Sequence, residues 1–165
     1  MTFPRGGAGL FLSFEGGEGS GKSVQARALA AWLAESGHEV VATREPGGTP
    51  LAEHVRELLL HAADVPLSAE AEALLFSAAR AQLVRDVIGP ALAAGKIVVA
   101  DRFFDSTLAY QGHGRGADLA GLAAATRLAV GAVRPDRTFL LDLPVEVALA
   151  RARGRLGGRV PDRFE

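Results

Sequence analysis

The segment Leu10-Phe-Leu-Ser-Phe-Glu15-Gly-Gly-Glu-Gly-Ser-Gly21-Lys-Ser23 decides the fold. Its last eight residues fit the pattern G-x-x-x-x-G-K-[ST]. They follow an apolar, strand-like run over Leu10–Glu15 and open a helical pattern over Lys22–Ser36. Glycines let the backbone curl with its N–H groups facing inward, and the N-terminus of the next helix adds the positive end of its dipole. This context predicts a loop that binds nucleotide phosphates.

The loop also predicts individual roles. We expect Lys22 to reach the β and γ phosphates and the Ser23 hydroxyl to bind Mg²⁺. Sixteen of the 18 basic residues are arginine, and one of the two lysines stands where a compact ammonium suits the task. A glycine-rich turn that fits the pattern by chance is the alternative, and the strand and helix around it argue against that. The expected phosphate-binding residues are Gly16, Gly17, Glu18, Gly19, Ser20, Gly21, Lys22 and Ser23.

Composition excludes several classes of protein. The 165 residues suit one domain, and a net charge of −1 lacks the basic excess of a nucleic-acid coat or an electrostatic membrane binder. There is no cysteine, so disulfides, thiolate metal sites and thiol nucleophiles are excluded. The apolar runs are strand-sized and the N-terminus lacks the apolar core of a secretion signal. We expect a soluble, cytoplasmic protein that binds neither nucleic acid nor membrane.

The pattern along the chain predicts an α/β fold. Strands are expected at Leu10–Glu15, Glu39–Thr43, Ile97–Ala100 and Thr138–Asp142, after a glycine-rich lead-in over residues 1–9. Helices are expected at Lys22–Ser36, Pro50–His61, Leu119–Val130 and, capped by Ser68, through Phe76 and Arg80. The strands lack polar alternation, which indicates burial on both faces in a parallel sheet flanked by helices on both faces. Ligands of such sheets bind at the carboxyl ends of the strands.

Asp101 ends the apolar strand Ile97–Ala100. Beside a phosphate loop, a carboxylate at this position is typical of one that holds Mg²⁺ directly or through water. The alternative role is a helix cap. We favour the metal role.

Other motifs narrow the function. The chain has no N-K-x-D motif of a regulatory GTPase and no L-S-G-G signature of a transporter-type ATPase. A helicase or motor would need a longer chain. A small kinase remains.

Four motifs in order resemble the thymidylate kinases over most of the chain. They are Phe14–Ser23, Thr43-Arg-Glu-Pro-Gly-Gly48, Leu75-Phe-Ser-Ala-Ala-Arg80 and Asp101-Arg-Phe-Phe-Asp-Ser-Thr-Leu-Ala-Tyr-Gln-Gly112. The resemblance implies a P-loop NTPase fold of the nucleoside monophosphate kinase type. It implies transfer of phosphate from ATP to dTMP with Mg²⁺, and a homodimer.

The resemblance also assigns an acceptor site. Phe76 would stack on thymine and Arg80 would donate to its carbonyl, while Arg44 and Arg102 would grip the acceptor phosphate. Glu18 would contact the sugar 3′-hydroxyl, and Tyr110 would disfavour a 2′-hydroxyl. For most of these positions a core or solvated surface residue is the alternative. The remaining expected substrate contacts are Glu45, Pro46, Arg56, Ser106, Thr107 and Gln111.

An arginine-rich stretch, about residues 151–163, resembles the family's lid. One branch of the family carries a catalytic arginine in the phosphate loop, where this chain has Gly19; the bacterial branch carries its arginines in the lid. We therefore expect catalytic roles for Arg153 and Arg155 beside Lys22 and Arg102; the alternative is a basic exposed helix end. The domain expected is a single kinase domain, 1–165, that ends before the family's C-terminal helices.

Two other functions stay open at this stage. One is another small nucleoside monophosphate kinase that uses the same phosphate loop. The other is a nucleotide-binding module with weak catalysis.

Overall fold

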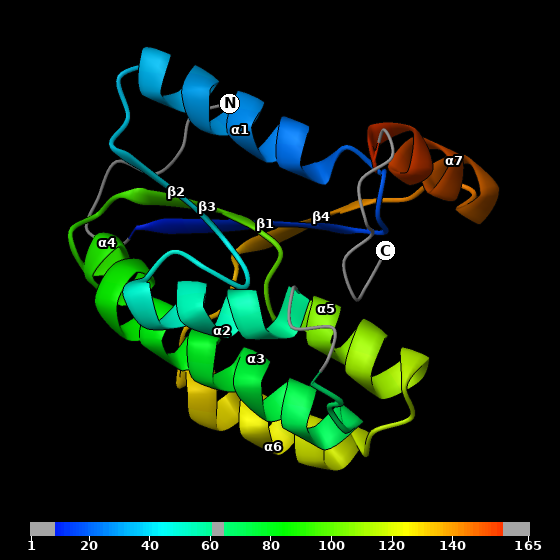
Figure 1. The fold of residues 1–165 in the computed structure, drawn as a ribbon. Coiled ribbons are helices and arrows are strands. Elements are labelled where there is room, and N and C mark those ends of the chain that lie inside the picture. Colours follow the sequence, from blue (N-terminus) through cyan, green and yellow to red (C-terminus); the bar gives the residue numbers. More distant parts are fainter. Residues whose placement is uncertain (1–8, 61–64, 157–165) are drawn as a thin grey trace.

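The computed structural model describes residues 9–60 and 65–156. Its sheet contains β1 (Leu10–Gly16), β2 (Val40–Arg44), β3 (Ile97–Asp101) and β4 (Arg137–Leu141). All pairs are parallel and the order is β2-β3-β1-β4 (Figure 1). Arg44 lies opposite Asp101, and Asp101 lies opposite Phe14. The carboxyl ends of three strands therefore meet at one edge, as the sequence predicts.

Helices cover both faces of the sheet. Helix α1 lies on one face, while α2, α3, α4 and α6 lie on the other, with α7 beside the loop that follows β1 (Figure 1). The described residues also include two π-helical turns, η1 and η2. The helical bounds are α1 (Lys22–Glu35), α2 (Pro50–Leu60), α3 (Ala69–Leu83), η1 (Val84–Ile88), α4 (Gly89–Ala93), α5 (Phe104–Thr107), η2 (Leu108–Gly114), α6 (Leu119–Val130) and α7 (Val145–Leu156).

Local sequence explains where these helices begin. The Ser68 hydroxyl accepts the N–H of Ala71 at 3.2 Å and so caps α3, as predicted. Asp118 caps α6 in the same way. Proline at the first position of α2 has no N–H to leave unsatisfied. These local signals place the helix starts within a residue or two of their predicted positions.

Alternate residues of β1 pack into two separate cores. Leu12 and Phe14 lie in the core on the α1 side, together with the fully buried Leu33 of α1. Phe11 lies in the opposite core with Ile88. Each such side chain contributes about 1.5–3 kcal/mol on burial. Because Glu15 alternates with Phe14, its carboxylate is buried on the same side of the sheet as Phe11.

Burial on both faces holds for β1 and β3 but is wrong for β2 and β4. In β4, Phe139 is 42% and Leu140 70% exposed. These two strands form the edges of the sheet, and in the part of the chain described here nothing pairs with their outer sides. No helix within the described ranges is both long and apolar enough to cross a membrane.

Candidate active site

A cavity of about 320 Å³ lies at the carboxyl ends of β1, β2 and β3. All twelve residues expected to contact the substrate line it, together with Lys22, Ser23 and Asp101. Six of the lining residues are basic and three are acidic, which suits an anionic ligand. The twelve are Glu18, Arg44, Glu45, Pro46, Arg56, Phe76, Arg80, Arg102, Ser106, Thr107, Tyr110 and Gln111.

The phosphate loop joins β1 to α1, as its sequence predicts. The Lys22 ammonium is buried, donates to the Gly17 carbonyl at 3.2 Å and lies 3.7 Å from the Glu18 carboxylate. Gly19 has φ +76°, and a Cβ there would stand 2.2 Å from the carbonyl oxygen of Ala148 in α7. With α7 in this position the loop has no room for a side chain at residue 19, which is consistent with the glycine found there.

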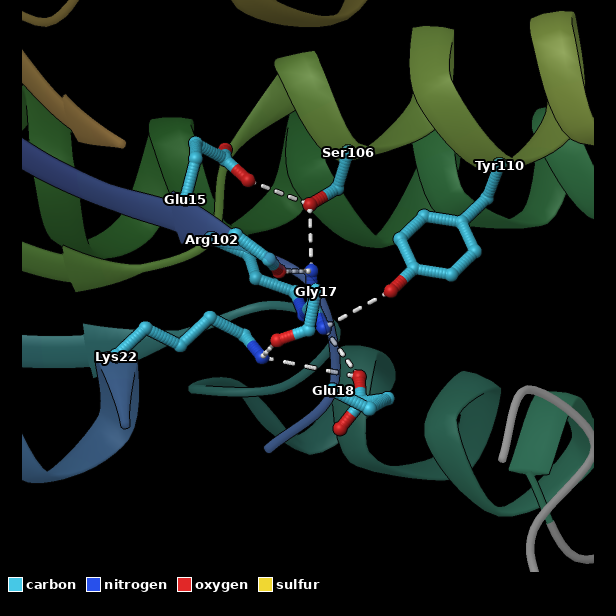
Figure 2. A network of polar contacts seen from close by, with 8 residues as sticks. Glu15, Gly17, Glu18, Lys22, Arg102, Ser106 and Tyr110 are labelled. Atoms are coloured by element: carbon cyan, nitrogen blue, oxygen red, sulfur yellow. Dashed lines mark hydrogen bonds and ion pairs between the residues drawn. The ribbon is translucent and has the colours of Figure 1, made fainter. Parts of the chain in front are cut away.

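Arg102 is the centre of a network at the mouth of the loop (Figure 2). Its Nη1 donates to the Gly16 carbonyl at 3.1 Å and to Ser106 Oγ at 3.0 Å. Its Nη2 donates to the Glu18 carboxylate and to the Tyr110 hydroxyl, and the guanidinium lies over the Tyr110 ring. The arginine therefore faces the phosphate loop with both of its terminal nitrogens engaged.

The backbone at Arg102 is strained, with φ +72°, a value that non-glycine residues seldom adopt. Glu15 holds the segment in place, because its carboxylate accepts the Phe103 N–H at 2.7 Å and the Ser106 hydroxyl at 2.6 Å. Burial raises the pKa of Glu15, although these two hydrogen bonds and the Arg102 charge oppose the rise. Sequence reasoning missed Glu15; the available signal was an acid in an otherwise buried strand.

A second arginine lies at the opposite end of the cavity. Arg80 is 1% exposed, pairs with Glu45 Oε2 at 2.7 Å and donates to Thr107 Oγ1 at 3.0 Å. Its Nη1 is buried without a hydrogen-bond partner among the described residues. Burial raises the pKa of Glu45, and the Arg80 charge works against that rise. The predicted donor to the base is thus present with one nitrogen uncommitted.

Apolar contacts also reach this end. Phe76 lines the cavity and packs beside the cluster of Val55, Leu59 and Ala79. The core role and the ligand-stacking role considered for Phe76 are therefore compatible in one side chain.

Two of the expected arginines have partners at the rim. Arg44 is about half exposed and its Nη2 donates to both oxygens of Glu53, at 3.0 and 2.9 Å. Arg56 donates to the Pro46 carbonyl at 2.9 Å. Both line the cavity, yet a phosphate or base would have to compete with these contacts.

The residues fit a magnesium ion. Asp101 Oδ1 is buried with no hydrogen-bond partner in the described part of the chain, and Ser23 lines the same cavity. Within those same ranges no three His, Asp or Glu side chains gather into a metal cluster. Such a pair suits Mg²⁺, which takes its other ligands from water and substrate phosphates.

The lid prediction is described only in part. Arg151–Leu156 continue α7, and Arg153 is exposed and does not line the cavity. The side chain of Arg155, and all of residues 157–163, lie outside the described part of the structure, as does the lead-in over residues 1–8.

A family model described as thymidylate kinase matches residues 14–159. The chain belongs to the thymidylate kinase family. A thymidylate kinase of Ectopseudomonas mendocina is 55% identical over 95% of this chain and 73% of the relative, and one of Geobacter sulfurreducens is 52% identical over 95% and 74%. The crystal structure of a thymidylate kinase from Ehrlichia chaffeensis superposes with a TM-score of 0.77, at 42% identity, covering 92% of this chain and 82% of that one. The family fold is therefore the one described above.

Proposed function

We propose that this chain transfers the γ-phosphoryl group of ATP to dTMP, yielding ADP and dTDP. One observation carries the proposal. The phosphate loop, with Lys22, and the two arginine sites, Arg102 and Arg80, open into a single cavity of a chain of the thymidylate kinase family.

The site suits a reaction between two anions. The nucleophile is already a phosphate oxyanion, so no general base is required. Catalysis then rests on holding donor and acceptor in line and screening their repulsion. Lys22 and Arg102 supply that positive charge, and the loop N–H groups Gly16 to Ser23 hold the donor phosphates.

The remaining cavity residues bind and select the acceptor. At the base end, Phe76 stacks on the thymine, and the uncommitted Nη1 of Arg80 donates to a carbonyl. Glu18 and Tyr110 contact the sugar. Rim and wall contacts come from Arg44, Glu45, Pro46, Arg56, Ser106, Thr107 and Gln111.

Ser23 and Asp101 would hold Mg²⁺, which supplies charge neutralisation of the ATP phosphates when bound. The chemistry of this oxygen pair supports the assignment: a hydroxyl and a buried carboxylate oxygen that has no partner among the described residues.

Further parts of the proposal concern the whole molecule. We infer one kinase domain, with Arg153 and Arg155 in a lid that closes on the transferred phosphoryl. We also infer a cytoplasmic homodimer that binds no nucleic acid. Large apolar side chains on the outer helices support the dimer: Leu51 is 47%, Leu74 61% and Leu128 88% exposed.

A coupled assay of ADP release tests the activity. The chain is supplied with ATP, Mg²⁺ and, in parallel, dTMP, dUMP, dCMP or GMP. We expect release that depends on the acceptor and is fastest with dTMP. Release that no nucleoside monophosphate stimulates, from a folded chain that binds ATP, would refute the proposal, and a preference for another acceptor would indicate a different monophosphate kinase. Light scattering after gel filtration measures the oligomeric state.

A further inference from the structure

A second buried carboxylate lies behind the base end of the cavity. Glu72, in the first turn of α3, is 0% exposed. It accepts the Nε2 group of Gln111 at 3.2 Å on one oxygen and Nη1 of Arg115 on the other. Arg115 also donates to the Leu67 carbonyl at 3.0 Å. The cluster therefore joins the start of α3 to the η2 turn.

The carboxylate fixes which way the Gln111 amide points. An ionised carboxylate only accepts hydrogen bonds, and in an amide only the NH₂ group donates. Nε2 must then face Glu72, and the atom that Gln111 can present to the cavity is Oε1, an acceptor. Gln111 lines the cavity and is itself 1% exposed, so the place of its amide group is fixed and its partner decides which of the two amide atoms faces the cavity.

The opposite polarity comes from Arg80, which lines the same cavity. Glu45 and Thr107 engage its Nε and Nη2, which leaves Nη1 as a donor. The base end thus offers Gln111 Oε1 as an acceptor and Arg80 Nη1 as a donor. A pyrimidine imide, with N3–H beside a carbonyl at C4, complements this pair. Cytosine, with an acceptor N3 and an amino group at C4, would set donor against donor and acceptor against acceptor.

We propose that Glu72 is a positioning residue that fixes the acceptor polarity of Gln111 and thereby selects imide pyrimidines over cytosine. Arg115 supplies the charge that pairs with the buried carboxylate. This inference rests on the proposed function and names the determinant of its base selectivity.

The decisive variant is Glu72→Gln, which keeps the side-chain shape but can either donate or accept. Freed from a fixed partner, the Gln111 amide can turn. We expect the ratio of kcat/KM for dTMP over dCMP to fall about tenfold, through a higher KM for dTMP. The ratio for dTMP over dUMP should stay constant, because both bases are imides. General loosening of the site would move both ratios, and that result would overturn the proposal.

Two further variants test whether Glu72 acts through Gln111. In a Gln111→Leu background, Glu72→Gln should cause no further change in the dTMP to dCMP ratio; an undiminished effect there would contradict the proposal. Arg115→Lys keeps a positive charge beside the buried carboxylate but gives up the guanidinium contacts with Glu72 and the Leu67 carbonyl. It should lower the melting temperature while changing the ratio far less than Glu72→Gln does. If the Glu72 and Arg115 variants lost the same selectivity, the packing of α3 against η2 would explain the effect, and the proposal would be wrong.

The unmodified chain provides a test that needs no variant to fold. Calorimetry with dTMP, dUMP and dCMP should show that both imides bind at least tenfold more tightly than dCMP. Equal binding of dCMP overturns the inference even if dTMP is phosphorylated. Selective binding without ADP release would refute the proposed activity and leave the inference standing.

Discussion

The two ends of the cavity hold their arginines in different ways. At the base end, Arg80 and its partner Glu45 are 1% and 5% exposed at their side chains. At the phosphate end, Arg102 and its partner Glu18 are 14% and 25% exposed, and Glu18 also faces Lys22 (Figure 2). One pair is sealed inside the protein, while the other stands where the phosphates are expected to bind.

The difference indicates two tasks for the same residue type. A buried ion pair is costly to break, so it fixes the shape of the site before a ligand arrives. A pair that is partly open to solvent is less costly to break than a fully buried one and can be exchanged for a ligand anion. The permanent contacts of Arg80 would then determine base specificity. Arg102 and Lys22, whose contacts can be exchanged, would supply positive charge for the reaction.

The largest expected effect is on turnover at the phosphate end. Lys22→Ala should lower kcat by about 10³-fold or more, because it removes a charge that faces the transferring phosphoryl. Binding of dTMP, followed by calorimetry, should change little. Lys96→Ala is the matched control, since the only other lysine forms a surface ion pair with Glu39. Loss of dTMP binding in Lys22→Ala with turnover retained would contradict the assignment.

The next effect compares the two carboxylates directly. Glu45→Gln should lower the free energy of unfolding by about 3 kcal/mol, because Arg80 would be left buried without its counter-charge. Glu18→Gln, the same change at the phosphate end, should alter it by less than about 1 kcal/mol. Denaturant titration measures both. Equal losses would show that the two ends are built alike.

The smallest effect concerns pH and Glu15. Because burial raises its pKa above the ordinary 4.5 of a glutamate, Glu15 takes up a proton at a higher pH than an exposed one. Once protonated, Glu15 loses the hydrogen bond from either the Ser106 hydroxyl or the Phe103 N–H. The segment that carries Arg102 is then held less firmly. We expect the KM for dTMP to rise a few-fold as the pH falls through that range.

The Glu15 contribution to the free energy of unfolding should change with pH in the opposite direction to dTMP binding. The folded chain binds this proton more tightly than the unfolded chain does. The Glu15 contribution is therefore most favourable below 4.5 and declines as the pH rises through the raised value. Lowering the pH should thus weaken dTMP binding but should not reduce the Glu15 contribution to the free energy of unfolding. Glu15→Gln should remove its share of both trends, and an unchanged KM profile in that variant would exclude Glu15 as their source.

The fold was predictable from sequence because its signals are local, whereas most residues of the cavity were predicted from the resemblance to a known family. The phosphate-loop pattern placed the start of α1 at Lys22, Ser68 placed the start of α3, and α6 has the predicted bounds Leu119–Val130. Three strand ends carry the motifs, and parallel strands bring such ends to one edge. That topology gathered residues as distant as Glu18 and Tyr110 into one cavity.

The supporting acids were not predictable in this way. A glutamate in the first turn of a helix, such as Glu72, is usually a solvated residue that complements the helix dipole. Its burial depends on Arg115, 43 residues away, and on Gln111 in a π-helical turn that no periodicity signals. The strained backbone of Arg102 likewise depends on Glu15, 87 residues earlier in the chain. The sequence predicted burial on both faces for β2 and β4 as well. This was wrong because the composition of a strand does not show whether it lies at the edge of its sheet.

The close contact of Gly19 with α7 restricts how this kinase could be rebuilt. Any Cβ at residue 19 collides with the Ala148 carbonyl, which belongs to the backbone and cannot turn aside. A cation moved into the loop would therefore have to come with a retreat of α7, the helix that carries Arg153. A side chain at residue 19 and the present position of α7 exclude each other sterically. A substitution at residue 19 therefore calls for a matching shift of the backbone near Ala148.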